Sequence, residues 1–113
     1  MSRLPDLMHL HDAEPGDRDL LFMIAQEHAN EGRPAEALAW LSRYLDRGGD
    51  VGAAHRLAAG CHLRLGDAAA ARRSLETGVA AALAFGHRTL AQELRDEIDD
   101  LGEQRERGEP GDP

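Results

Sequence analysis

Six histidines are the residues of this sequence with the clearest capacity for chemistry. His9 and His11 lie beside Asp12 near the start of the chain, and His55 and His62 fall seven residues apart on one face of a predicted helix. Imidazole and carboxylate groups bind Zn²⁺, but a zinc site needs three or four ligands that converge. The sequence offers no such set, so it predicts no metal site and no cofactor. A metal- or ligand-sensing role for the histidines remains as an alternative.

Nucleophilic catalysis is not predicted either. The serines, Ser2, Ser42 and Ser74, do not lie in the sharp strand-to-helix turn that exposes a hydrolase nucleophile. Cys61 precedes His62, but successive residues of a helix point about 100° apart, so the two side chains do not form a dyad. The sequence has no glycine-rich phosphate-binding loop and no lysine. We therefore expect that the protein is not an enzyme.

Composition and charge exclude further classes of function and partner. A chain of 113 residues with 42% hydrophobic and 30% charged residues is typical of one small soluble domain. Its net charge of −8 argues against a nucleic-acid partner, which needs a cationic face, and against an anionic membrane surface. No apolar stretch is long enough for a signal peptide or a membrane span, so the sequence predicts a cytoplasmic protein.

Apolar residues recur every three or four positions along most of the chain, which predicts amphipathic helices and no sheet. Asp50 and Asp67 are suited to cap the helices that follow them, and Gly32 and Gly66 are suited to end the helices before them. The predicted helical segments are residues 2–13, 20–29, 34–46, 51–65, 67–85 and 87–101. Residues 102–113 are charged and rich in Gly and Pro, which predicts a disordered acidic tail.

The middle of the chain repeats itself. The stretch EGRPAEALAWL at residues 31–41 returns as LGDAAAARRSL at residues 65–75, a shift of 34 residues. Small side chains and a glycine are what two closely crossing helices and the turn between them require. The matched pairs are Ala25 and Ala59, His28 and His62, Gly32 and Gly66, Ala37 and Ala71, and Leu41 and Leu75.

This repeat resembles the tetratricopeptide repeat, a helix–turn–helix unit of about 34 residues with the signature W-x2-L-G-x2-Y, A-x3-F and P. The places of that signature hold Leu21, Ile24, Ala25, His28, Ala37 and Leu41 in the first copy, and His55, Ala58, Ala59, His62, Ala71 and Leu75 in the second. The family places aromatic residues between packed helices where His28, His55 and His62 stand, which favours structural roles for these histidines.

The resemblance covers about residues 3–85 and implies an all-α fold, in which antiparallel helical hairpins stack as a short right-handed superhelix. It divides a single domain, residues 1–101, into a half repeat (2–13), two repeats (18–51 and 52–85) and a capping helix (87–101). Because the half repeat leaves one face of Leu21, Met23 and Ile24 poorly covered, we also expect a homodimer through that end.

In this family the first helices of successive repeats line a concave groove that receives a peptide. The resemblance implies a groove formed by Phe22, Gln26, Asn30, Arg56, Leu63, Arg64 and Leu94. Because guanidinium groups bind carboxylates in a bidentate manner, Arg56 and Arg64 favour an acidic peptide or a C-terminal carboxylate.

The expected function is that of a non-catalytic interaction module, an adaptor or scaffold that holds a peptide or partner protein. Trp40 is a candidate surface anchor for such a partner, because aromatic residues dominate interface hot spots. The other interpretation of Trp40 is that it packs partly over the convex face. A structural, self-assembling subunit is a further alternative to the adaptor.

Overall fold

The computed structural model describes residues 1–106, and the side chains of residues 1–102. Within that part the chain forms α-helices joined by turns, with no strand, so the all-α prediction is confirmed. The helices are α1 (Leu4–Ala13), α2 (Arg18–Asn30), α3 (Pro34–Asp46), α4 (Ala53–Arg64), α5 (Ala68–Ala84) and α6 (Arg88–Glu106).

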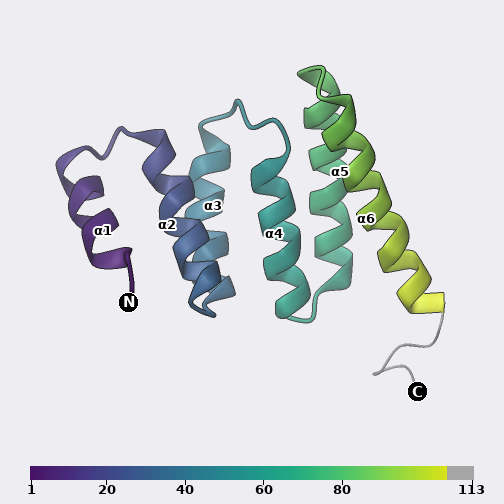
Figure 1. Ribbon diagram of the computed structural model, residues 1–113, viewed down its shortest axis with the longest axis horizontal. Helices are drawn as coiled ribbons and strands as arrows, with labels where there is room; N and C mark the ends of the chain where they lie inside the picture. Colours follow the sequence, from purple (N-terminus) through teal and green to yellow (C-terminus); the bar gives the residue numbers. More distant parts are fainter. Residues whose placement is uncertain (107–113) are drawn as a thin grey trace.

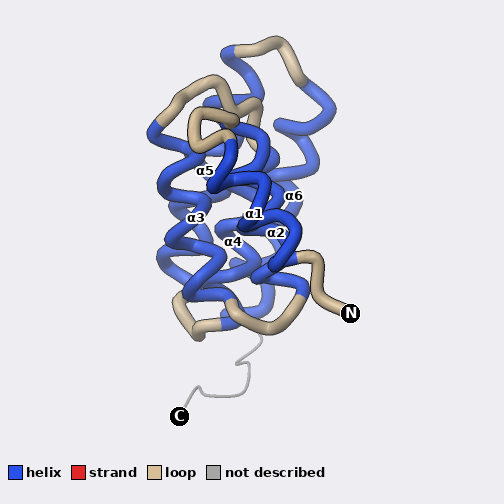
Figure 2. Tube along the Cα trace, turned by 90° about the vertical axis from the view of Figure 1, so that its left-hand side faces the viewer, coloured by secondary structure: helices blue, strands red, loops and turns tan. Residues whose placement is uncertain are grey.

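Consecutive helices pack side by side as antiparallel hairpins, in the order in which they occur in the sequence (Figure 1). Seen from the side, α3 and α5 form one row, whereas α1, α2 and α6 lie on the other side of the molecule (Figure 2). The result is an elongated body with principal extents of 48, 34 and 21 Å. None of the described helices is long and apolar enough to cross a membrane.

The same turn closes three of the hairpins. A glycine with a left-handed backbone ends the helix, at φ 80° in Gly32, 81° in Gly66 and 76° in Gly86. The next residue then donates its backbone N–H to a carbonyl five positions earlier, which is the Schellman motif. These bonds run from Arg33 to His28 (2.9 Å), from Asp67 to His62 (2.8 Å) and from His87 to Ala82 (2.8 Å).

The predicted aspartate caps are also present. Asp67 accepts a hydrogen bond from the backbone N–H of Ala70 at 3.0 Å, at the start of α5. The buried carboxylate of Asp50 accepts from Gly52 at 2.8 Å and from Ala54 at 3.2 Å, at the start of α4. Each cap satisfies backbone donors that the first turn of a helix leaves unpaired.

The matched alanines and leucines of the two repeats are buried alike. Leu41 and Leu75 are both almost fully buried, and Ala37 and Ala71 have no exposed surface. Each leucine lies in an apolar cluster that joins its own hairpin to the next helix, so the repeat in the sequence is also a repeat in the core.

The two ends of the chain differ from the sequence predictions. α6 continues to Glu106, so residues 102–106 are helical and the predicted boundary at residue 101 is wrong. Residues 107–113 lie outside the described part, and the disordered tail stays a prediction for them. At the other end, α1 covers α2 well enough to bury Leu21 and Ile24 completely. Met23, the third residue of that face, is still 36% exposed, and the homodimer through this end stays a prediction.

Candidate functional site

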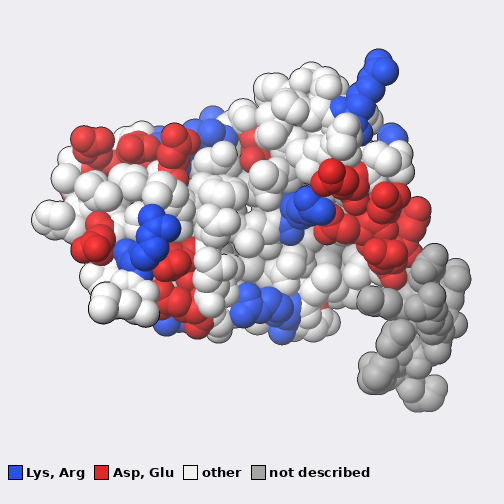
Figure 3. Space-filling view, in the orientation of Figure 1, with Lys and Arg blue, Asp and Glu red and all other residues white. Residues whose placement is uncertain are grey.

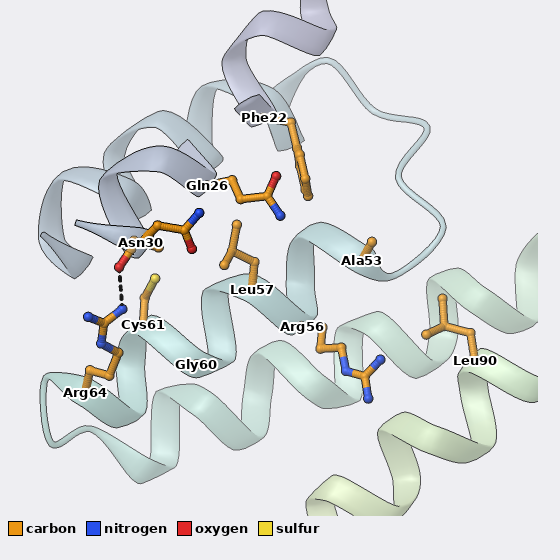
Figure 4. A pocket seen from close by; sticks show the side chains of 11 residues that line it. Phe22, Gln26, Asn30, Ala53, Arg56, Leu57, Gly60, Cys61, Arg64 and Leu90 are labelled. Carbon is orange, nitrogen blue, oxygen red and sulfur yellow. Dashed lines mark hydrogen bonds between the residues drawn. The ribbon is translucent and has the colours of Figure 1, made fainter. Parts of the chain in front are cut away.

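The first helices of the two hairpins border a hollow of about 450 Å³, which α6 closes at one edge. Figure 4 shows that side chains from α2 and α4 face each other across it. The residues that line it are Phe22, Gln26, Ala29, Asn30, Ala53, Arg56, Leu57, Gly60, Cys61, Arg64 and Leu90.

The rows that line this groove follow from the repeat. α2 contributes Phe22, Gln26 and Asn30, which are four residues apart and therefore share one helical face. The residues 34 positions later are Arg56, Gly60 and Arg64, which line the facing wall from α4. Five of the predicted groove residues thus come together around one hollow, in addition to Gly60.

A neighbouring stripe on α4 was not predicted. Ala53, Leu57 and Cys61 lie beside the first stripe at the same spacing of four residues, and they line the hollow as well. Their apolar character is a signal that the sequence contains, because these residues continue the helical face that turns toward α2. Burial raises the pKa of the Cys61 thiol, while the positive charge of Arg64 opposes that rise.

The middle of the groove is apolar and open. Gly60 has no side chain, and a Cβ atom built there would meet nothing within 4 Å. Phe22, Leu57 and Leu90 are the large apolar side chains of its lining. Gln26 and Asn30 are exposed, and their amide groups make no hydrogen bond within the described part of the chain. A ligand would therefore meet an apolar wall with two unpaired carboxamides beside it.

Arg64 holds the two walls together at one end of the groove. Its guanidinium donates a hydrogen bond to the carbonyl oxygen of Ala29 at 2.7 Å, drawn as a dashed line in Figure 4. Ala29 is near the C-terminus of α2, where carbonyl groups have no partner in the helix and a positive charge is favourable. Part of Arg64 therefore serves to cap α2.

Arg56 is held from the other side, by α6. Its guanidinium lies 2.5 Å from a carboxylate oxygen of Glu97 and 3.3 Å from one of Glu93. The hydrogen bond with Glu97 raises the pKa of Arg56 above its usual value. Because the Arg56 side chain is still 45% exposed, we expect these ion pairs to add little to stability. They nevertheless occupy the guanidinium that was expected to bind a ligand carboxylate.

The groove continues toward α6 as a second hollow of about 200 Å³. Arg56 and Gly60 line both hollows, so the two are adjacent on the same face of α4. The remaining lining residues are Ala59, Leu63, Leu75, Glu97, Asp100 and Leu101. In Figure 3, Asp and Glu side chains gather on the α6 side of this face, whereas its middle is largely uncharged.

Two predicted groove residues lie elsewhere. Leu94 has no exposed surface and packs in the core with Leu75 and Ala71, so its assignment to the groove was wrong. The physical reason is Gly78 on α5, whose missing side chain leaves room that the Leu94 side chain fills. Leu63 is 43% exposed and lines only the second hollow, not the first.

Trp40 is part of the packing between helices and does not project from the surface. Its ring contacts the apolar cluster formed by α1 and α2, and the buried His11 ring meets it edge-on at 5.3 Å. The Arg43 guanidinium lies over the Trp40 ring at 4.5 Å. This arrangement agrees with the packing interpretation, and the anchor role remains a prediction without structural support.

The histidines do not lie together in one site. Nδ1 of His28 accepts a hydrogen bond from Arg33 at 3.1 Å, whereas His55 and His62 line a separate hollow between α3, α4 and α5. Within the described residues, no three histidine, cysteine, aspartate or glutamate side chains are grouped so that they could hold a metal ion. The metal-sensing alternative therefore gains no support.

No family model matches the sequence, no curated protein matches it, and no solved structure matches it. The likeness to tetratricopeptide repeats therefore depends on the chain's own repeat and on the geometry described above.

Proposed function

We propose that the protein is a non-catalytic adaptor of the tetratricopeptide type, which holds a peptide segment of a partner in the groove between α2, α4 and α6. The recurrence of the same Schellman turn, and the equal burial of Leu41 and Leu75 and of Ala37 and Ala71, support the repeat assignment. On this assignment the helices form a short right-handed superhelix, and the groove is its concave face.

The groove itself is the observation that carries the proposal. It is open along its length, mostly apolar, and bordered by the unpaired amides of Gln26 and Asn30. A carboxamide can donate to a peptide carbonyl and accept from a peptide N–H, so two of them on one helix suit an extended backbone. The apolar lining of the groove would select the side chains of the bound peptide.

A selection from a random peptide library displayed on phage tests this proposal. The discriminating variant is Gly60→Leu, because a Cβ atom built there meets nothing within 4 Å and a longer side chain at this place would occupy the groove. The matched control is Ala80→Leu, which adds the same exposed side chain to α5 away from the groove. We expect enriched peptides that bind the wild type and the control but lose most of their binding to Gly60→Leu.

Charge reversal of Arg56 and Arg64 would be a poorer test, because both side chains already have partners within the chain that the new carboxylates would repel or leave unpaired. If no enriched peptide is sensitive to Gly60→Leu, the groove does not bind peptides and the proposal fails.

A further inference from the structure

The two arginines of the groove are both engaged inside the chain, which changes the charge that a ligand would meet. Arg64 donates to the Ala29 carbonyl at 2.7 Å. Arg56 is held by Glu93 and Glu97 at 3.3 and 2.5 Å. A ligand carboxylate could reach Arg56 only by displacing carboxylates that are already in place.

Negative charge exceeds positive charge at the α6 side of the groove. Glu97 and Asp100 line the second hollow together with Arg56, and Glu93 completes the ion pair. Two carboxylates therefore pair with one guanidinium, a third lines the same hollow, and the chain as a whole carries a net charge of −8. A second carboxylate from a ligand would be repelled here, whereas an ammonium or guanidinium group would meet oxygens that Arg56 does not fully neutralise.

The apolar lining places a further condition on the ligand. Phe22, Leu57 and Leu90 line the first hollow, and Leu63 and Leu101 line the second. Arg56 stands where the two hollows meet. A ligand that fills both would bring apolar side chains to either side of the carboxylates, so the matching peptide is apolar with a basic residue between or beside its apolar positions.

Building on the proposed function, we propose that the groove selects apolar peptide segments carrying a lysine or arginine that pairs with Glu93, Glu97 and Asp100 of α6. This is the opposite charge to the one expected from the sequence. The Arg56 guanidinium then acts as an internal competitor of the ligand and not as its anchor.

The sequences of the peptides that depend on the groove provide the first test. We expect Lys and Arg to outnumber Asp and Glu among the clones that lose binding to Gly60→Leu. If these clones are instead acidic, the inference is overturned while the peptide-binding function stands. If no clone depends on the groove, both proposals fail.

Two variants then give changes of opposite sign. A fluorescein-labelled synthetic copy of the most enriched groove-dependent peptide is titrated with each protein, and its Kd is measured by fluorescence anisotropy. The double variant Glu93→Gln, Glu97→Gln should raise Kd by about fivefold, since exposed charges contribute modestly. Arg56→Gln should lower Kd by about two- to threefold, because it removes the competing positive charge.

Both variants change only half-exposed ion pairs, so circular dichroism should show unchanged helix content. The two effects should also shrink as the salt concentration rises. A higher Kd for Arg56→Gln, with a lower Kd for the double variant, would show that Arg56 anchors an anionic ligand and would overturn the inference.

Discussion

The α2–α3 and α4–α5 hairpins have similar cores but pack differently against the next helix. Alanines and leucines 34 positions apart are buried alike, and the same glycine turn closes each hairpin. At one equivalent pair, however, the first hairpin has Tyr44 and the second has Gly78. Tyr44 packs against a cluster that includes Ala54 and Ala58 of α4, and Gly78 lies against Leu94 of α6.

Tyr44 fills its position with a large ring. Phe22 packs against that ring at 5.2 Å between centroids, and the Arg18 guanidinium lies over it at 4.0 Å. Gly78 leaves its position empty, and a Cβ atom there would lie 3.1 Å from atoms of both His55 and Leu94. α6 can thus pack closely on α5, which buries Leu94 and leaves Leu90 at the edge of the groove. The shared small residues build the hairpins, and the glycine at this position makes room for the helix that follows.

Replacing the shared leucines should have the largest effect. Leu41→Ala and Leu75→Ala each remove a fully buried side chain and leave a cavity, so each should lower the free energy of unfolding by about 2–5 kcal/mol. Urea denaturation measures both. Leu65→Ala, at a half-exposed position, is the control and should cost under about 1 kcal/mol. A large difference between the two buried sites would show that the hairpins are not equivalent.

The position that differs should be the next most sensitive. Gly78→Val would push side-chain atoms into contacts with His55 and Leu94 that are already close, and overpacking of this kind costs about 1–3 kcal/mol. Ala80→Val adds the same β-branched side chain at an exposed place on the same helix and should cost only about 0.5 kcal/mol. Equal losses for the two variants would mean that α6 does not pack closely on Gly78.

The shared turn should respond equally in both hairpins. Gly32→Ala and Gly66→Ala place a Cβ atom on a left-handed backbone, which should cost about 1 kcal/mol each. Gly60→Ala is a control in which the change in stability should have the opposite sign, because that glycine lies inside a helix and an added methyl group meets nothing. It should stabilise the protein by about 0.5–1 kcal/mol. Thermal unfolding followed by circular dichroism compares the three.

The smallest expected effect lies at the junction of the N-terminal segment with the first hairpin. A hydrogen bond from Ser2 lowers the pKa of Glu31 below its usual value of 4.5. A carboxyl group whose pKa is lowered in the folded state stabilises that state at pH values above its ordinary pKa. This contribution is lost as the pH falls through the lowered pKa. Glu31→Gln should therefore reduce Tm slightly at pH 7, and this reduction should shrink as the pH falls below 4.5.

Much of the fold follows from local signals in the sequence. Glycine at residues 32 and 66 and aspartate at residues 50 and 67 determine where helices end and begin, so the predicted bounds lie within a few residues of those observed. The spacing of four residues also predicts the groove rows of α2 and α4, because a regular helix fixes which residues share a face.

The predictions that did not hold depend on contacts between distant segments. Leu94 is buried because of Gly78, which belongs to another helix, and the helical period of α6 contains no information about that space. The partners of Arg56 lie 37 and 41 residues further along the chain, at Glu93 and Glu97. Many acids were available to it in the sequence, and only the packing of α6 against α4 and α5 selects these two.

The most direct test of the central claim is to locate a bound peptide on the protein. The most enriched peptide from the selection is added to isotope-labelled wild-type protein, and the backbone amide signals are followed by NMR. The proposed adaptor function predicts that the perturbed amides concentrate on the groove faces of α2 and α4, around Gln26, Asn30 and Gly60. Perturbations confined to α3 and α5, or to the ends of the chain, would contradict it.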